Sequence, residues 1–286
     1  MATRSGLAYS GGMKPSETND RHLSIPARRQ RLRWGLMLVW VLLMPITLYW
    51  FSPYLPFMGL VEGLVSGSVM VFAGMFVVSL VAGRLFCGWL CPAGAIQDLA
   101  MPARPRRVGR RTLQWVKFAI WLPWLGAWTG LAVAAAGGRP DGLRPDALFM
   151  LEHGISVSRP EAYIIYLAVL TLILGLALLL GRRGACHAIC WMAPFMIIGQ
   201  GLGRLIRLPG MLLRSEAARC TACGTCNAAC PMSLDIGAMA LAESTGPAPI
   251  SAPAAITIAH HDCIFCLRCV DSCPTSVLRP GFGQRG

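Results

Sequence analysis

Charged residues are scarce in this chain, and acidic residues are the scarcest. Of the 286 residues only 14% are charged, with 13 Asp and Glu against 26 Lys and Arg. A soluble globular domain carries nearer a quarter of its residues as charges, so the composition argues against an ordinary soluble protein. Histidine is also rare, at five residues, and none lies within a long apolar stretch. Without such a histidine pair, a b-type haem inside a membrane domain is not indicated.

Apolar residues take the place of the missing charges, and they are clustered. Four uncharged stretches approach the roughly 20 apolar residues with which a helix crosses a bilayer. They are Trp34–Phe51, Leu64–Gly83, Phe118–Ala136 and Ala162–Leu180. Pro45 and Pro123 fall within two of them, which neighbouring helices can accommodate inside a membrane. We therefore expect an all-α integral membrane four-helix bundle.

Basic residues flank these stretches unevenly. They are dense before the first stretch, between the second and third, and after the fourth, whereas residues 52–63 contain none. By the positive-inside rule, both termini and all cysteines are expected on the cytoplasmic side of a bacterial inner membrane. The net charge of +13 does not require nucleic acid, because residues 215–286 hold four Lys and Arg against five Asp and Glu. The excess surrounds the apolar stretches, where it meets lipid head groups, and we expect no nucleic-acid partner.

Eight of the twelve cysteines repeat one pattern near the C-terminus. The two runs are Cys220-x2-Cys223-x2-Cys226-x3-Cys230-Pro231 and Cys263-x2-Cys266-x2-Cys269-x3-Cys273-Pro274. Bacterial two-cluster ferredoxins hold two [4Fe–4S] clusters with this spacing, and the fourth cysteine of each run ligates the other cluster. The pattern predicts Cys220, Cys223, Cys226 and Cys273 at cluster 1, and Cys263, Cys266, Cys269 and Cys230 at cluster 2. Zinc sites use two CxxC pairs, and disulfide frameworks belong to oxidising compartments, so neither alternative matches.

The other four cysteines form two pairs with a spacing of four residues. Cys87 and Cys91 follow the second apolar stretch, and Cys186 and Cys190 follow the fourth, each after a Gly-Arg dipeptide. Two spans followed by CxxxC therefore occur twice, which predicts two parallel two-span repeats. The four thiols could form redox-active dithiols, a soft-metal or further iron–sulfur site, or an electron-transfer relay. Small buried residues at packed helix ends are the purely structural interpretation.

These motifs together carry a family resemblance. The apolar stretches, the element Cys87-Gly88-Trp89-Leu90-Cys91-Pro92, the pair Cys186–Cys190 and the C-terminal double run resemble the NapH/MauN-type membrane ferredoxin proteins, a superfamily related to NosR, NosH and FixG. The resemblance spans residues 31–280. It departs from the pattern at the second pair, where the proline is Pro194 rather than the residue after Cys190.

The resemblance implies a membrane component of the quinol dehydrogenase type. Such a protein passes electrons between the quinone pool and a periplasmic or membrane oxidoreductase or iron–sulfur partner, with two [4Fe–4S] clusters as cofactors and quinol as a diffusible substrate. The alternative is a maturation or assembly factor that reduces a metal centre or cofactor with its CxxxC thiols.

A few further side chains are candidates for proton transfer or for tuning a cluster. In the loops expected outside, a quinol proton could pass to Glu62, Asp141, Asp146, Glu152 or His153. His187 lies within the second cysteine pair, and His260 and His261 precede Cys263, where hydrogen bonding could tune a cluster potential. Each is more ordinarily a solvated or helix-end polar residue.

The domain organisation follows from these motifs. We expect a mobile cytoplasmic tail over residues 1–30 and the membrane domain, with both CxxxC motifs, over 31–193. An interfacial linker or amphipathic helix is expected over 194–214. An α+β ferredoxin-like module with two clusters should occupy 215–280, followed by a short tail over 281–286.

Overall fold

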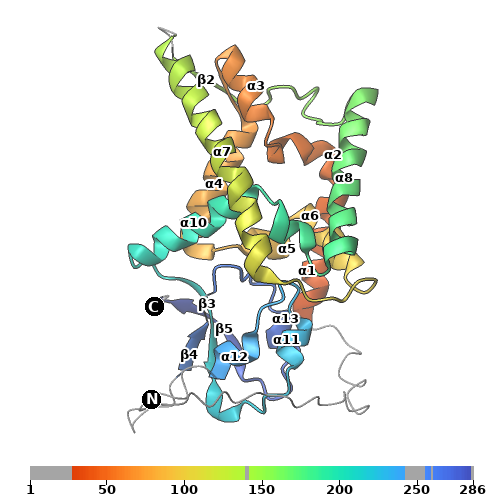
Figure 1. The fold of residues 1–286 in the computed structure, drawn as a ribbon, viewed down its shortest axis with the longest axis vertical. Helices are drawn as coiled ribbons and strands as arrows, with labels where there is room; N and C mark the ends of the chain where they lie inside the picture. The colour runs from red at the N-terminus through yellow and green to blue at the C-terminus, as the bar shows by residue number, and fades with distance from the viewer. Residues whose placement is uncertain (1–27, 139–141, 242–254, 259, 285–286) are drawn as a thin grey trace, which may run out of the picture.

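The computed structural model describes residues 28–138, 142–241, 255–258 and 260–284. The tail expected over residues 1–30 therefore lies almost entirely outside the described residues. The described chain divides into a large helical part and a smaller α+β part beneath it in Figure 1. One apolar core runs through both, because Phe72 and Met196 of the helical part cluster with Ile264 and Phe265 of the smaller part.

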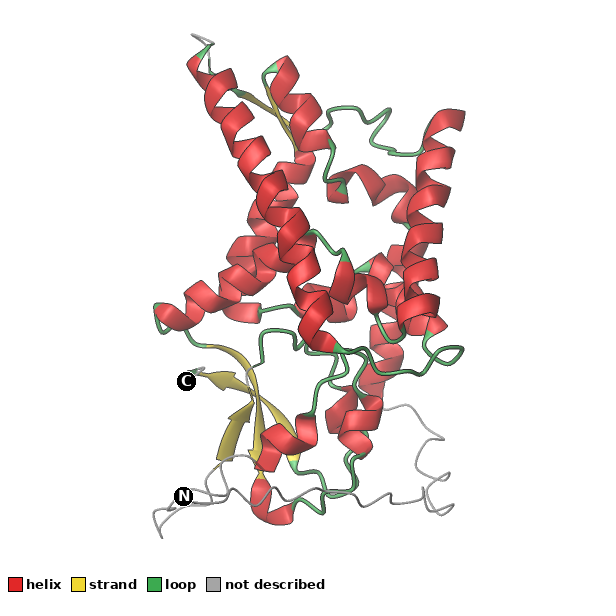
Figure 2. Cartoon of the chain, in the orientation of Figure 1, coloured by secondary structure: helices red, strands yellow, loops and turns green. Residues whose placement is uncertain are grey.

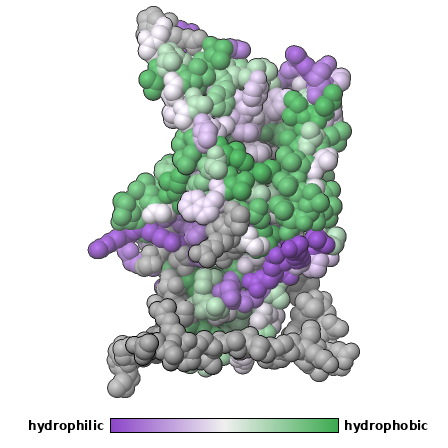
Figure 3. Space-filling model, in the orientation of Figure 1, coloured by the Kyte–Doolittle hydropathy of each residue, from purple (hydrophilic) through white to green (hydrophobic). Residues whose placement is uncertain are grey.

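Two of the four apolar stretches form long helices. α7 runs over Arg110–Gly137 and α8 over Pro160–Leu180, and each is long and apolar enough to cross a membrane. Only 6% of the apolar window of α7 and 11% of that of α8 are buried inside the protein. Helices that turn apolar side chains outward need an apolar environment, so these two helices indicate membrane association. Figure 3 shows hydrophobic residues over much of the helical part.

The first apolar stretch is helical but bent. α1 (Arg28–Leu42) meets α2 (Met44–Thr47) and the 3₁₀ turn η2 (Leu48–Phe51) at an angle of 60°. Pro45 stands at the start of α2, and a proline has no N–H to bond back to the preceding turn. The bend therefore falls where the sequence removes a helix hydrogen bond.

The second apolar stretch is helical over only part of its length. After α3 (Leu55–Glu62), residues Leu64–Ser66 form strand β1, which pairs in parallel with β2 (Arg144–Asp146). The helix α4 occupies Gly67–Ala82, 16 residues. The described residues thus contain two helices that are long and apolar enough to span a membrane, or three if the bent pair counts as one, and the four-span bundle is not confirmed.

The expected repeat is visible in the order of helices that carry the cysteine pairs. α4 leads into the five-residue helix α5 (Leu85–Trp89) and then α6 (Pro92–Ala100). α8 likewise leads into the five-residue helix α9 (Gly184–Ala188) and then α10 (Met192–Leu205). Gly83 and Gly181 join the helices at equivalent places with φ of 58° and 109°, which few other residues adopt. The two halves therefore share a local fold around CxxxC.

The α+β part contains a three-stranded antiparallel sheet in the order β4-β3-β5 (Figure 2). β3 (Gly210–Glu216) lies between β4 (Ala255–Ile258) and β5 (Leu278–Gly283), with Leu213 opposite both Ile258 and Pro280. The turn η3 and three short helices complete it: Ala217–Arg219, α11 (Thr225–Ala229), α12 (Ile236–Leu241) and α13 (Arg268–Asp271). α10 and the start of β3 occupy the segment expected as a linker, so the sheet begins before the expected boundary at residue 215.

Candidate iron–sulfur sites and the buried cysteine cavity

The four cysteines assigned to cluster 1 line one pocket of about 340 Å³ in the ferredoxin-like module. Three come from the first run and one from the second: Cys220, Cys223, Cys226 and Cys273. Hydroxyl groups accompany two of them, with Thr225 Oγ1 3.3 Å from Cys223 Sγ and Thr275 Oγ1 3.7 Å from Cys273 Sγ. The hydrogen bond from Thr225 lowers the pKa of the Cys223 thiol. Four thiols around one hollow are the donor set that a cubane requires.

The four cysteines assigned to cluster 2 line a second, smaller pocket. They are Cys230, Cys263, Cys266 and Cys269. Burial raises the pKa of Cys230 to about 11 and that of Cys263 to about 12. Such thiols are protonated at neutral pH unless a metal stabilises the thiolate, so cluster binding and proton release are coupled here. Each pocket groups three cysteines of one run with the fourth cysteine of the other run, and the assignment of these cysteines to two clusters stays a prediction.

The two runs fold as the same loop. Left-handed φ values occur at Ala222 and Phe265, at Gly224 and Leu267, and at Ser233 and Ser276, which are matching positions of the two runs. Five of these six residues carry a side chain, and such backbone is kept only where the surroundings impose it. A loop that wraps its thiols around a cluster fits this geometry.

The two pockets differ in exposure. All four cysteines of cluster 2 are buried, whereas Cys223 of the cluster 1 pocket is exposed and its three companions are half-buried. The cluster 2 pocket is therefore the buried one, and the cluster 1 pocket is the one that reaches the surface.

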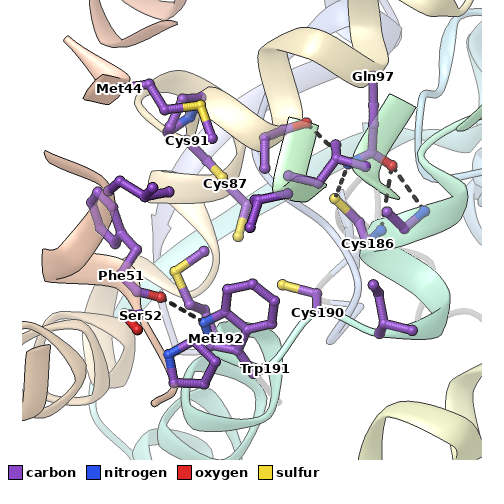
Figure 4. A pocket seen from close by; sticks show the side chains of 18 of the residues that line it. Met44, Phe51, Ser52, Cys87, Cys91, Gln97, Cys186, Cys190, Trp191 and Met192 are labelled. Atoms are coloured by element: carbon purple, nitrogen blue, oxygen red, sulfur yellow. Dashed lines mark hydrogen bonds between the residues drawn. The ribbon is translucent and has the colours of Figure 1, made fainter. Parts of the chain in front are cut away.

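The four CxxxC cysteines come together in the helical part. Cys87, Cys91, Cys186 and Cys190 line a single cavity of about 120 Å³. Figure 4 shows them around it, with Met44, Phe51 and Trp191 also at the wall. Cys87, Cys91 and Cys186 expose only 3%, 3% and 5% of their surface.

One loop joins this cavity to cluster 2. A Cβ added at Gly88 would lie 2.1 Å from the carbonyl oxygen of Ile264, so the loop between Cys87 and Cys91 touches the second run directly. Trp89 Nε1 donates to the Phe265 carbonyl at 2.9 Å, and Gln30 Nε2 donates to the Cys266 carbonyl at 2.9 Å. The cysteine cavity and cluster 2 are therefore adjacent through backbone contact.

Buried charges fix this junction. Asp98 forms ion pairs with both Arg33 and Arg183, and all three side chains are buried. Burial alone would raise the pKa of Asp98, but Arg183 and Arg33 outweigh it and hold that pKa below its usual range. The same arginines reach the CxxxC loop, with Arg33 Nε donating to the Gly88 carbonyl at 2.6 Å and Arg183 Nη1 to the Cys87 carbonyl at 2.8 Å.

A second buried group ties the module to the helices. Asp262, next to Cys263, accepts from Arg84 Nη1 at 3.0 Å and from Lys117 Nζ at 3.4 Å. Burial opposes ionisation of Asp262, but the hydrogen bond from His261 and the charges of Arg84 and Lys117 lower its pKa. Sequence reasoning missed both charge groups. A signal was present in Asp98, which is the sole acidic residue between Glu62 and Asp141.

The remaining candidates lie away from the thiols or support other groups. Asp141 lies outside the described residues. Glu62 and His153 are exposed, Glu152 pairs with Arg159 at the surface, and Asp146 Oδ1 accepts from the Leu148 N–H.

The three candidate histidines are all close to cysteines in the sequence. His187 is buried within α9. The rings of His260 and His261 stack with their centroids 4.2 Å apart, and both residues directly precede Asp262. The backbone N–H of Asp262 donates to His260 Nδ1 at 3.0 Å. The described contacts of this pair therefore support Asp262.

Comparisons with known proteins agree with this geometry. A family model for a 4Fe-4S binding domain matches residues 65–111, and a model for a 4Fe-4S dicluster domain matches residues 212–274, which include both C-terminal runs. The methylamine utilization ferredoxin-type protein MauN of Methylorubrum extorquens is 28% identical over 193 residues, 63% of this chain and 59% of the relative. The resemblance to MauN/NapH-type ferredoxin proteins is confirmed. The two matched regions support a ferredoxin-type protein with 4Fe–4S binding domains.

Two further relatives are similar to the chain over longer stretches. MauN of Methylobacillus flagellatus is 26% identical over 247 residues, 84% of this chain and 76% of the relative. The putative electron transport protein YccM of Escherichia coli is 23% identical over 221 residues, 74% of this chain and 54% of the relative. The matches thus span little more than half the length of two of the three relatives. No solved structure matches the chain.

Proposed function

We propose that this protein passes electrons between a membrane quinone pool and a redox partner by way of its two [4Fe–4S] clusters. The observation that carries the proposal is the cavity between α8 and the CxxxC loops, because it is apolar, lies among the membrane helices and adjoins cluster 2. Ile165, Val169 and Ile173 of α8 form one wall, and Cys87 and its three companions form another.

The cavity has the composition of a quinone site. Its lining is apolar apart from Tyr49, Ser52, Gln97 and the four cysteines. Ligand sites of this kind combine an apolar body with a few polar groups that orient the ligand, which suits a ring with two opposed oxygens. A second apolar cavity, between α4, α7 and α10, is lined by Trp121 and Phe195 but by none of the cysteines. We therefore favour the first cavity.

The burial of the cysteines indicates the order in which electrons would pass through the protein. A quinol at the cavity gives up two electrons and releases two protons to solvent, and each bound [4Fe–4S] cluster accepts one electron. The Gly88 loop connects the cavity to the buried cluster 2 cysteines, and Cys223 presents cluster 1 to the surface. We place the clusters on the cytoplasmic side, as the arginine distribution predicts, with a membrane or periplasmic oxidoreductase or an iron–sulfur protein as partner.

The alternative is an assembly factor whose CxxxC thiols react directly with a client protein. Thiol exchange needs an accessible thiolate. Cys87, Cys91 and Cys186 are buried, which favours electron transfer through the site over attack by its thiols.

A side chain that fills the cavity tests whether quinone binds there. Val169→Trp puts a large side chain against the cysteines, while Leu167→Trp puts the same group on the same helix at a position that is exposed and outside the cavity. We expect the Val169 variant to slow reduction of the clusters by a soluble quinol roughly tenfold or more, because the ring no longer reaches its site. The Leu167 variant should match the wild type, and dithionite should reduce all three proteins fully.

The readout is the visible absorbance of the clusters in anaerobic detergent solution. Equal quinol rates in the two variants would rule out this cavity. Failure of quinol to reduce and of quinone to oxidise the wild type would rule out the quinone pool as its partner.

A further inference from the structure

We propose that Cys87, Cys91, Cys186 and Cys190 together ligate a third iron–sulfur cluster, in addition to the two in the ferredoxin-like module. The proposal rests on the electron route above and deepens it, because a cluster at the cysteine wall of the cavity would lie between quinol at the α8 wall and cluster 2. Its test concerns metal content and does not depend on quinol.

The four thiols form a ligand set for one cluster. The two CxxxC pairs occupy equivalent places in the two repeats: Cys87 and Cys186 lie within α5 and α9, Cys91 and Cys190 follow these helices, and all four thiols line the same cavity. A binuclear cluster has two irons, each held by two thiolates, so one pair from each repeat matches its symmetry. Cys91 is also the N-cap of α6, where the helix dipole favours a negatively charged thiolate.

A buried positive charge lies beside these thiols. The Arg84 side chain is fully buried, and its Nε and Nη2 atoms have no hydrogen-bond partner among the residues that the structure describes. It interacts electrostatically with Cys87, Cys190 and Cys186. Orphaned guanidinium donors in a buried place are costly unless an anion accepts from them. An iron–sulfur cluster with four thiolates carries net negative charge and supplies such acceptors.

Neighbouring groups support the same interpretation. Arg183 also interacts with Cys186, and Gln97 Nε2 donates to Cys186 Sγ at 3.1 Å. Amide donors to cluster sulfurs are a common way in which proteins tune iron–sulfur centres. Figure 4 shows Gln97 between Cys186 and the α9 backbone, which holds the amide in place.

The region matched by the first family model, residues 65–111, holds only half of this ligand set. That region contains only two cysteines, Cys87 and Cys91, yet the model describes a 4Fe-4S binding domain. Two thiolates do not complete a cluster, and the structure brings the missing two from α9 and the residues that follow it.

The test is the iron and acid-labile sulfide content of the full chain, purified anaerobically. We expect about ten of each per chain for a binuclear third cluster or about twelve for a cubane, against about eight for two cubanes alone. The double variant Cys87→Ser/Cys186→Ser should fall to about eight while the electron paramagnetic resonance (EPR) signals of both module clusters remain. Ala93→Ser, which adds a hydroxyl to the same cavity and removes no thiol, should retain the wild-type content.

A wild-type content of about eight iron, with or without zinc, would overturn the proposal. So would a higher content that the double variant leaves unchanged. Because no quinol is present, either result leaves the quinol experiment to be decided separately.

Discussion

At the scale of single residues, the junction between helices and module depends on Gly88. Its backbone approaches the Ile264 carbonyl so closely that a methyl group has no room, although its φ lies outside the left-handed region. Gly88→Ala should therefore separate the CxxxC loop from cluster 2, at a cost of about 1–3 kcal/mol in stability. Gly74→Ala, on α4 with no atom within 4 Å of an added Cβ, is the matched control and should be neutral or slightly stabilising.

Thermal melting of the purified protein measures the Gly88 prediction. The Gly88 variant should melt well below the Gly74 variant and accept electrons from quinol more slowly. Equal melting temperatures would show that the loop and cluster 2 are not in contact.

The buried carboxylate of Asp98 gives a second residue-scale prediction. Asp98→Asn leaves Arg33 and Arg183 buried without a counter-charge and should destabilise the protein by about 3–5 kcal/mol. The surface pair of Glu152 and Arg159 is the control, and Glu152→Gln should cost less than about 1 kcal/mol.

The Asp98 pair also has a pH signature. Because the folded protein holds the pKa of Asp98 below its unfolded value, its stabilisation is complete above the unfolded pKa of about 3.9 and disappears as pH falls below it. Stability measured from pH 7 down to pH 3 should therefore fall more steeply in the wild type than in Asp98→Asn. Parallel curves would contradict the buried pair.

The crossed assignment, in which the fourth cysteine of each run ligates the other run's cluster, can be tested one residue at a time. Cys273 stands in the second run but lines the cluster 1 pocket, and Cys230 stands in the first run but lines the cluster 2 pocket. Cys273→Ser should perturb the same EPR signal as Cys220→Ser, and Cys230→Ser the same signal as Cys266→Ser. If Cys273→Ser instead resembled Cys269→Ser, each run would hold its own cluster.

At the scale of secondary-structure elements, local patterns predicted more than non-local ones. α7 and α8 followed from uncharged runs, a signal that lies within one segment. The spacing within each cysteine run predicted the crossed grouping of the cysteines that line the two pockets. The strand at Leu64–Ser66 was not predicted, because it depends on pairing with Arg144–Asp146, far away in the sequence. Taken alone, its residues are typical of an apolar helix. The 60° bend after Leu42 had a local cause in Pro45, but composition alone does not show whether a proline bends a helix or is absorbed, as Pro123 is in α7.

The cysteine cavity shows the same limit. Its walls come from η2, α8 and the two CxxxC segments, which are far apart in the sequence. The matched pairs allowed a site built from all four thiols, but they did not predict an apolar space beside it. Trp191 Nε1 donates to the Phe51 carbonyl at 2.8 Å and ties η2 to the second pair, a contact without any sequence pattern.

At the scale of the whole molecule, the thiol-lined cavity and the two cysteine pockets differ in their place and in their exposure. The helical part lies at one end of the molecule and the ferredoxin-like module at the other (Figure 1). The thiol-lined cavity lies in the helical part, the buried cluster 2 pocket adjoins the CxxxC loop, and the cluster 1 pocket is the more exposed of the two. Two buried carboxylates, Asp98 and Asp262, form ion pairs with basic side chains at the junction between the helices and the module. These ion pairs fix the two parts relative to each other. This order is what a conduit from membrane to partner requires.

The most direct test of that conduit is anaerobic EPR spectroscopy of the intact protein, freeze-quenched after mixing with a quinone-pool substrate. Quinol added to oxidised protein, or quinone added to dithionite-reduced protein, should change the signals of both module clusters within turnover times. At least one of the two directions should do so, and Val169→Trp should slow it. If neither quinol nor quinone changes either signal, while dithionite and ferricyanide do, the protein is not a conduit between the quinone pool and its clusters.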